Sequence, residues 1–207
     1  MTTYDVNVGT GNGSVGMAFY GVTGSVTAPD DISDIASTTA ITTAGYTDMG
    51  ELSSDGMTIS NVGSRQTIRN WAGAARRTTY TDPGYEISIP MITSKENTLK
   101  AIFGTASSKG AVGVYTEAAT ATHGKVNTLH LDGKTTSGEQ AFLLLAKDGD
   151  DQFMIEVPDG YCVCESDIVF APGSEIKWPA TIVTGQGGLT IIKDDGQVTT
   201  QGGNTSI

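Results

Sequence analysis

The sequence predicts a mainly β protein with one flanking α-helix, at about residues 94–103, and long loops. Short segments that alternate apolar and polar residues recur between turn-forming residues, which is the pattern of half-buried strands. Glycine is abundant, with 27 residues, whereas hydrophobic residues make up only 38% of the chain. This combination favours many short strands, exposed loops and apolar surface that is shared with partners. A chain of 207 residues is long enough for one sizeable β-rich domain or two small ones.

The residues from 93 to 104 are typical of a short helix that covers a sheet. Thr93 and Glu96 have the spacing of a capping box, in which each side chain bonds a free backbone amide of the first turn. Gly104 supplies a left-handed C-terminal stop. The apolar stripe is expected to consist of three residues spaced i, i+3 and i+4: Leu99, Ile102 and Phe103. A helix of about ten residues is marginal alone, so this one needs a sheet to pack on.

The chain divides into three parts by its pattern. Residues 1–44 lack a sustained period of 2 or 3.6 and are predicted to form a partly extended N-terminal arm. Residues 45–195 are predicted to form a single β domain, in which 105–134 is a possible insertion, and residues 196–207 a flexible tail. Three glycines in the arm spell G-x-G-x-x-G: Gly11, Gly13 and Gly16. A dinucleotide site needs a helix after this motif, and glycines interrupt the residues that follow, so we expect no nucleotide site.

From residue 45 onward, turn-forming residues separate alternating segments. A turn at Asp55-Gly56 precedes a strand that contains Met57 and Ile59. The other strands are predicted, in order, at 65–71, 76–81, 85–89, 111–115, 126–131, 142–147, 152–157, 161–170, 176–184 and 189–193. Turns are expected at 82–84, 148–151 and 158–160. The acids of 148–151 lack the spacing of a calcium-binding loop, so we interpret them as part of a turn.

Cys162 and Cys164 are the only cysteines. They lie two residues apart in a predicted strand, so their side chains share one face, which we expect to point inward. Such positions are poorly placed for a disulfide, and no second Cys or His pair completes a zinc site. We therefore expect two reduced, buried thiols.

Charge is distributed unevenly along the chain. The net charge of −11 argues against a protein that holds nucleic acid through its phosphates. Residues 1–64 contain seven acidic residues and no Lys or Arg, and residues 147–207 contain ten acidic residues against three Lys. All four arginines lie within thirteen residues: Arg65, Arg69, Arg76 and Arg77. They form either a solvated basic face or a strip that meets acidic patches on neighbouring copies, because interfaces favour arginine for pairing with carboxylates.

The sequence contains no motif that is typical of an enzyme. His123 and His130 are the only histidines, and no nucleophile motif, Walker A loop or H-E-x-x-H motif accompanies them. We therefore expect no catalytic residue, no metal and no cofactor. Trp71 and Trp178 are candidates for glycan contacts, but we interpret both as core residues. Because no apolar run approaches a membrane span and no signal-peptide layout opens the chain, we expect synthesis in the cytoplasm without membrane insertion.

The order of these elements over residues 45–184 resembles the major tail tube protein of long-tailed, siphovirus-type bacteriophages. The first landmarks are a Gly-Tyr lead-in, a Ser-x-Asp-Gly-x-Thr-Ile segment, a strand that ends in Trp71, and a helix that ends in Leu-x-x-Ile-Phe-Gly. A hairpin, a Val-Pro-Asp-Gly turn and an Ile-x-Trp-Pro-x-Thr segment follow in the C-terminal half. Each motif is common in β proteins, and their order carries the resemblance.

The resemblance implies a β-sandwich or split barrel with one flanking helix, which assembles into hexameric rings that stack as a tube. It also implies a virion protein that is made in the host cytoplasm, is not an enzyme, and conducts genomic DNA during ejection without binding it specifically. Implied partners are the tape measure protein in the lumen, the tail terminator and the distal tail proteins. Contractile and secretion-system inner tubes share this architecture.

Two groups of residues are candidates for function in such a tube. The four arginines are candidates for contacts between subunits. Four acidic residues on polar faces of predicted strands are candidates for the lumen, where carboxylates would repel the DNA backbone: Glu86, Glu156, Glu165 and Asp167. The alternative function is a glycan- or receptor-binding β-sandwich on a virion surface.

Overall fold

The computed structural model describes residues 15–29, 39–81, 84–133, 137–148, 151–164, 166–171 and 176–194. These residues form a mainly β fold, as the sequence predicted, with a second, five-residue helix that it did not predict. The helices are α1 (Thr39–Thr43) and α2 (Glu96–Phe103). The strands are β1 (Val15–Val22), β2 (Thr47–Glu51), β3 (Thr58–Asn61), β4 (Ser64–Arg69), β5 (Ala75–Thr81), β6 (Tyr85–Met91), β7 (Gly113–Glu117), β8 (Val126–His130), β9 (Gln140–Asp148), β10 (Asp151–Cys164), β11 (Trp178–Thr184) and β12 (Thr190–Asp194).

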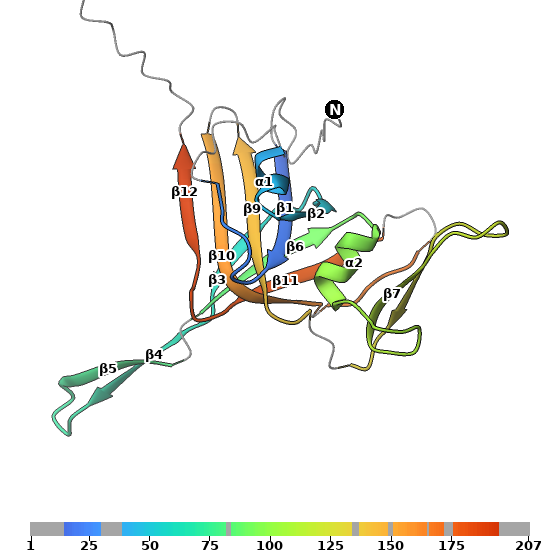
Figure 1. The fold of residues 1–207 in the computed structure, drawn as a ribbon. Coiled ribbons are helices and arrows are strands. Elements are labelled where there is room, and N and C mark those ends of the chain that lie inside the picture. Colours follow the sequence, from blue (N-terminus) through green and yellow to red (C-terminus); the bar gives the residue numbers. More distant parts are fainter. Residues whose placement is uncertain are drawn as a thin grey trace, which may run out of the picture.

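One antiparallel sheet forms the body of the molecule, with the order β2-β1-β9-β10-β11-β6-β3. The 14-residue strand β10 connects the two halves of this sheet. Its first half pairs with β9 and β12, and its second half pairs with β11. A further bridge between Leu52 and Met91 joins the chain just after β2 to the end of β6. The sheet therefore curls into a partly closed barrel. Two separate hairpins, β4–β5 and β7–β8, lie outside it (Figure 1).

The core has two parts, one on each face of the β1-β9-β10 region. The larger part fills the curled sheet and includes the buried face of α2. The smaller part lies on the other face, where Ile41 of α1 and Tyr46 pack against residues of β1, β9 and β10. Its buried residues on those three strands are Met17, Phe19, Ala141, Leu143, Leu145 and Met154. The strands β1, β9 and β10 are thus buried on both faces.

Strand β1 lies in the segment that the sequence analysis assigned to an N-terminal arm, and it is an inner strand between β2 and β9. Ala18 faces the larger core, and Met17 and Phe19 face the smaller one. A strand that is buried on both faces has no polar face, so it shows no alternation in sequence. Gly16 lies near the start of strand β1 rather than before the helix that a dinucleotide site requires; Gly11 and Gly13 lie outside the described residues.

The predicted helix is confirmed in its apolar stripe and its C-terminus, but at eight residues it is shorter than the predicted 94–103 because it begins at Glu96. Leu99, Ile102 and Phe103 are buried, and Gly104 ends the helix with φ 75°. The predicted capping box is wrong. The helix starts at Glu96, its N-cap Lys95 has no side-chain cap bond, and the hydroxyl of Thr93 instead accepts the amide of Glu51 at 2.8 Å. Thr93 therefore ties the start of the helix to β2, and the buried Thr98 hydroxyl ties it again by donating to the carbonyl of Met49.

The predicted turn at 158–160 is a bulge within the continuous strand β10. The pairing of β10 with β9 shifts between Val157 and Gly160, which leaves Pro158 and Asp159 outside the ladder. A bulge accommodates proline because it needs no paired N–H there. The strand then ends at Cys164, so the predicted continuation to residue 170 is also wrong. Both thiols are free and lie on the core side, as predicted, but only Cys162 is buried, whereas Cys164 is half-buried.

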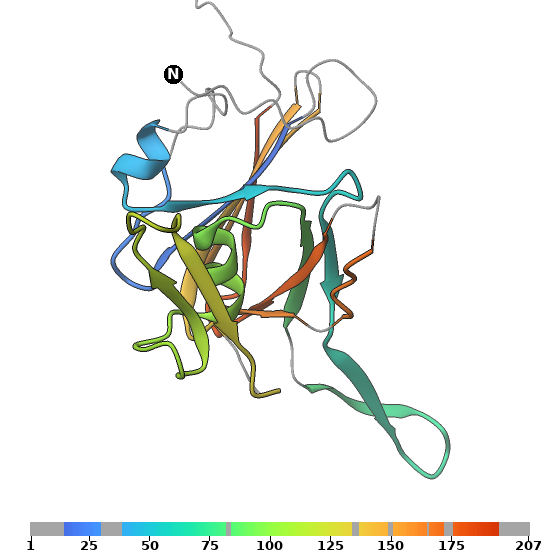
Figure 2. The same ribbon diagram turned by 90° about the vertical axis from the view of Figure 1, so that its right-hand side faces the viewer.

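The other predicted strands from residue 57 onward are present within a few residues of their expected ends, while β2 was missed. The region 105–134, a possible insertion, contains the β7–β8 hairpin, and it packs against α2 (Figure 2). Its Val114 is fully buried in the larger core. This hairpin is therefore anchored to the body of the protein, in contrast to β4–β5.

Candidate functional site

The hairpin β4–β5 extends away from the body of the molecule (Figure 2). Its strands pair with each other, and neither has a substantial contact with another described helix or strand. Those of its side chains whose exposure the structure describes are exposed or half-buried. A two-stranded hairpin is marginally stable by itself in water, because it buries little apolar surface. A partner that packs against an isolated hairpin of this length would therefore stabilise it.

The tip of this hairpin is held by its own hydrogen bonds. Asn70 donates its amide to the carbonyl of Ala74 at 2.9 Å and accepts the Ala74 amide with its side chain at 2.8 Å. The Arg69 guanidinium donates to the carbonyl of Gly73 at 2.9 Å, and Gly73 has φ 81°. Trp71 lies in this turn with its side chain fully exposed, at 106% of its reference area. The interpretation of Trp71 as a core residue is therefore wrong.

Trp178 is the buried tryptophan, as the sequence predicted. Its side chain is 6% exposed, its indole N–H donates to the hydroxyl of Ser94 at 2.9 Å, and its ring meets Phe103 edge to face. The two tryptophans thus have opposite environments. Trp178 fastens the α2 segment to β11, whereas Trp71 makes no comparable contact within the described chain.

The four candidate arginines all belong to the hairpin. In the β4–β5 pairing, Arg65 lies opposite Tyr80, Ile68 lies opposite Arg77, and Arg69 lies opposite Ala75. Arg69, Arg76 and Arg77 are exposed; the side chain of Arg65 is outside the described part. All ion pairs found among the described residues are formed by lysines: Lys100, Lys109, Lys125, Lys177 and Lys193. The three described arginines therefore form no ion pair with a carboxylate of the described chain.

The half-sheet β3-β6-β11-β10 has one face in the core, and no described helix or strand covers the other. We call the uncovered side the open face. Its residues occupy alternate positions on the four strands, and all are exposed or half-buried: Thr58, Ser60, Glu86, Ser88, Pro90, Tyr161, Val163, Pro179, Thr181 and Val183. The open face contains one carboxylate and no Lys or Arg.

The candidate acidic residues do not lie together. Glu86 lies on the open face, opposite Val183 and Ser60. Glu156 lies opposite Leu143, on the side of the smaller core. Burial, and secondly the charge of Glu156, raise the pKa of Tyr46 to about 12. Asp167 is exposed in the loop after β10, and Glu165 lies outside the described residues.

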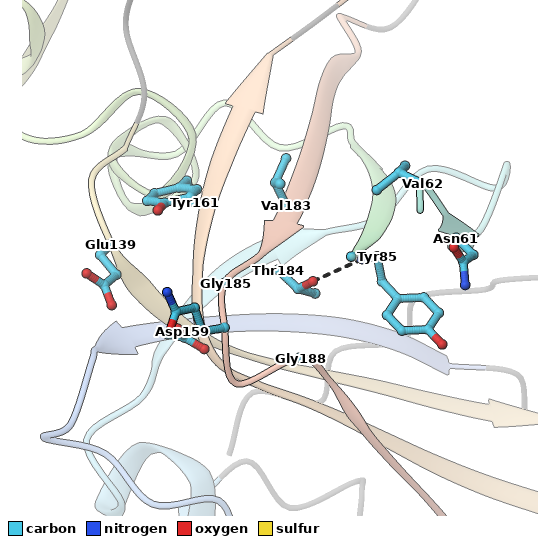
Figure 3. A pocket seen from close by; sticks show the side chains of 12 residues that line it. Asn61, Val62, Tyr85, Glu139, Asp159, Tyr161, Val183, Thr184, Gly185 and Gly188 are labelled. Atoms are coloured by element: carbon cyan, nitrogen blue, oxygen red, sulfur yellow. Dashed lines mark hydrogen bonds between the residues drawn. The ribbon is translucent and has the colours of Figure 1, made fainter. Parts of the chain in front are cut away.

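A groove of about 1120 Å³ crosses the end of the half-sheet, where β11 ends and β6 begins (Figure 3). Tyr161, Glu139 and Asp159 lie toward one end of it, and Tyr85 lies toward the other. Both tyrosines are exposed, at 39% for Tyr85 and 43% for Tyr161. Two carboxylates and no Lys or Arg line the groove. Sequence reasoning did not find it, because its residues come from five separate segments of the chain.

Hydrogen bonds fix the shape of the groove. The Asp159 side chain accepts the amide of Gly187 at 2.9 Å, and its carbonyl accepts the amide of Gly185 at 2.8 Å. The hydroxyl of Thr184 accepts the amide of Tyr85 at 3.1 Å (Figure 3). Asp159 therefore holds the turn after β11, while Glu139 is exposed at the rim.

Comparison with known families identifies this fold. The family model for phage tail tube protein matches residues 6–187, which include the whole described sheet up to β11 and both hairpins. The chain belongs to the phage tail tube protein family. No curated protein matches it closely enough to count as a relative. Membership implies a structural, non-enzymatic component of the phage tail that assembles with itself and with other tail proteins.

The remaining candidates fit a structural role in a tail tube protein. His123 and His130 are exposed at or beside β8, where the His123 ring contacts the carbonyl of Gly124 at 2.7 Å. Within the described ranges, no group of three or more His, Cys, Asp or Glu side chains is arranged to hold a metal ion. None of the described helices is long and apolar enough to cross a membrane.

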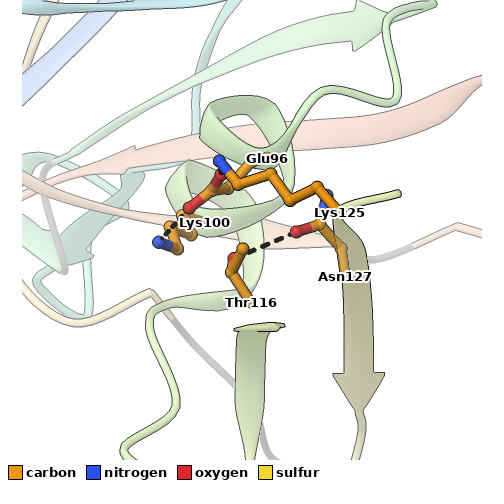
Figure 4. A network of polar contacts seen from close by, with 5 residues as sticks. All are labelled: Glu96, Lys100, Thr116, Lys125 and Asn127. Atoms are coloured by element: carbon orange, nitrogen blue, oxygen red, sulfur yellow. Dashed lines mark hydrogen bonds and ion pairs between the residues drawn. The ribbon is translucent and has the colours of Figure 1, made fainter. Parts of the chain in front are cut away.

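One polar network connects α2 of this tail tube protein to the β7–β8 hairpin (Figure 4). The Glu96 carboxylate pairs with Lys100 at 2.5 Å and with Lys125. Hydrogen bonds from Lys100 and then Lys125 are the main causes that lower the pKa of Glu96 to about 2. Thr116 of β7 donates to the side chain of Asn127 of β8 beside this network, at 3.0 Å.

Because its pKa is lower in the folded protein than in the unfolded chain, Glu96 is expected to stabilise the fold above pH 4.5 and to lose this effect as the pH falls toward 2. We expect the Glu96→Gln variant to be less stable than the wild type by about 1 kcal/mol at pH 7, because it loses the carboxylate that pairs with both lysines. The loss is limited to this size because solvent screens the exposed Lys125. The difference should vanish near pH 2. Urea unfolding at pH 7, 4.5 and 2.5 measures it.

A matched control is Glu117→Gln, which removes a longer and more exposed pair with Lys109. It should change the free energy of unfolding by less than Glu96→Gln at every pH. If the Glu96→Gln and wild-type stabilities differ equally at pH 7 and pH 2.5, ionisation of Glu96 does not support the fold.

Proposed function

We propose that the chain polymerises as stacked hexameric rings that form the tail tube of a long-tailed phage, and that the channel conducts DNA into the host during ejection. The observation that carries this proposal is a projecting hairpin on a body whose edge strands β3 and β12 each have one side unpaired within the described residues. An isolated hairpin with exposed arginines and an exposed tryptophan favours contact with a second protein. Membership of the tail tube family makes further copies of the chain the natural partner.

The edges of the body sheet support assembly. Within the described chain, β3 pairs only with β6 and β12 pairs only with β10, so each leaves one edge without a partner. Open edges are hazardous in a monomer because they template pairing with other chains. Closure of a ring would pair such edges, as closure of a barrel does.

We propose that the open face lines the lumen, with Glu86 as its carboxylate. Phosphate groups bind proteins mainly through Lys and Arg. The described open face contains neither, and small polar residues and proline make up most of it. A surface without cations and with one carboxylate per subunit would let DNA slide without holding it. Glu156, on the side of the smaller core, is a weaker candidate for the lumen than Glu86.

A tail tube of this kind would also have other proteins as partners. A tape measure protein would occupy the lumen during assembly, and tail terminator and distal tail proteins would contact the two ends. We infer no enzymatic activity, and the region 105–134, which packs outside the body sheet on α2, is proposed to lie on the outside of the tube.

Negative-stain microscopy and sedimentation of the purified protein over a range of concentrations test this function. Hollow rings or tubes with a central channel are expected. A compact monomer or trimer at every concentration, together with measurable affinity for a sugar, would instead favour a glycan- or receptor-binding module.

The arginines of the hairpin provide a second prediction. Reversal of charge in Arg65→Glu/Arg69→Glu is expected to raise the concentration needed for assembly about tenfold or more, because like charges meet across the contact. The thermal unfolding of the monomer should change little, since the described Arg69 contacts only the exposed tip. Sedimentation measures assembly, and circular dichroism measures folding.

Arg65→Lys/Arg69→Lys is the matched control, which retains charge but loses the bidentate geometry of arginine and should have a smaller effect. Lys109→Glu reverses a charge in an exposed ion pair elsewhere and should assemble normally. Unchanged polymerisation of the Arg65→Glu/Arg69→Glu variant would contradict an interface role for these arginines.

A further inference from the structure

We propose that the groove at the end of the half-sheet receives the hairpin tip of a second copy of the chain, with Trp71 as its anchor. This pairing rests on the proposed self-assembly and assigns the surface that the hairpin contacts. Three features carry it: the form of the tip, the lining of the groove, and the distance between the two within one chain.

The tip has the form of a preformed anchor. The bonds among Arg69, Asn70, Gly73 and Ala74 hold the turn without help from any other element. They leave Trp71 fully exposed, with the 48% exposed Ile68 on the adjacent strand. Tryptophan and arginine are the residues most enriched at the energetic centres of interfaces. A turn that is already ordered loses little conformational entropy when it binds.

The groove is large enough for this tip and is complementary to it in charge. Its volume of about 1120 Å³ exceeds the roughly 300–1,000 Å³ that is usual for small-molecule sites, so it has room for a segment of chain. Tyr85 and Tyr161 offer aromatic surface to an indole ring. Glu139 and Asp159 offer carboxylates to the guanidinium groups of Arg69, Arg76 and Arg77, which form no ion pair with the described residues of their own chain.

The tip cannot reach the groove of its own chain. Val62 lines the groove, and β4 begins two residues later at Ser64. At roughly 3.3 Å per residue, the six residues of β4 carry the tip about 20 Å from its base. The hairpin also points away from the body (Figure 2). The contact therefore joins different surfaces of two copies, and such a head-to-tail contact continues into a ring or a helical array rather than ending at a dimer.

Mixing two variants of the full chain tests the pairing. Trp71→Ala disables the tip and leaves the groove intact, whereas Glu139→Arg/Tyr161→Ser disables the groove and leaves the tip intact. Asp159 is left unchanged because it holds the turn after β11. Both variants change exposed side chains, and thermal unfolding confirms that each is folded.

For each variant alone, the protein concentration at which copies associate through the hairpin is expected to be at least about 30 times that of the wild type. In an equimolar mixture, one assembly of each variant should associate with one of the other, which doubles the mass of either alone. Association stops there because each pair has only one intact tip and one intact groove. Sedimentation and native mass spectrometry measure this. Glu117→Arg, a charge reversal away from the groove, should behave like the wild type.

The pairing is wrong if Glu139→Arg/Tyr161→Ser assembles like the wild type, or if the mixed variants do not join. These results would leave the proposed function standing whenever the wild type still forms tubes. Conversely, joining of the mixed variants together with the absence of rings or tubes from the wild type would support the pairing and refute the tube.

Discussion

Replacement of Phe142 by alanine is expected to destabilise the fold by about 3–5 kcal/mol. The Phe142 side chain is fully buried in the larger core, on the central strand β9, where it lies opposite Tyr20 of β1 and Val157 of β10. Its removal leaves a cavity between strands that pair on both sides and cannot collapse easily. Because domains of this kind have a total stability of only about 5–15 kcal/mol, the variant should be close to unfolding at 37 °C. Urea and thermal denaturation measure the loss.

Phe170→Ala is the matched control, because it deletes the same side chain from the surface. Phe170 is 69% exposed and has only an edge contact with Trp178 among described ring pairs, at 6.3 Å. We expect a loss of about 1 kcal/mol or less. Equal losses for the two variants would mean that the sheet does not close around Phe142.

Removal of the hairpin is expected to abolish assembly without unfolding the protein. Val62 donates its amide to the carbonyl of Gly84 at 3.1 Å, and β3 pairs with β6 up to Asn61 and Tyr85. An Asn-Gly turn in place of residues 63–83 would therefore connect β3 directly to β6 as a tight hairpin. Because β4 and β5 have no substantial contact with the body, the midpoint of thermal unfolding should shift by only a few degrees. Microscopy should show neither tubes nor stacked rings.

The corresponding control shortens the loop 118–124, between β7 and β8, and retains Lys125 for its pair with Glu96. This variant should assemble like the wild type, because we place this loop on the outside of the tube. Tubes that form normally without residues 63–83 would contradict the proposal that the hairpin joins subunits.

Local sequence signals were sufficient wherever an element is buried on one face only. In β6 the buried Ile87 and Ile89 alternate with more exposed residues, so the period of 2 was visible. In α2 the stripe of Leu99, Ile102 and Phe103 and the stop at Gly104 were equally direct. The β9–β10 hairpin was predicted from the turn at 148–151, whereas β4 and β5 were predicted only as successive strands.

Several predictions failed because a long-range contact overrode a local preference. Thr93 has the right spacing for a cap, but the amide of Glu51, 42 residues away, takes its hydroxyl. Pro158-Asp159-Gly160 has the composition of a turn, but pairing with β9 and β11 on either side keeps β10 continuous through a bulge. Trp71 was interpreted as a core residue, whereas its hairpin extends away from the body.

The sequence by itself determined the mainly β class, the helix with its apolar stripe, most strand positions, the free cysteines and the concentration of arginines in one segment. These features depend on residues close together in the chain. Only the tertiary structure decided that β1 is an inner strand, that Glu86 and Glu156 lie on different faces, and that five segments meet in one groove. Such features arise from pairing between distant strands, which depends on the packing energy of the whole sheet and has no signature in a local window.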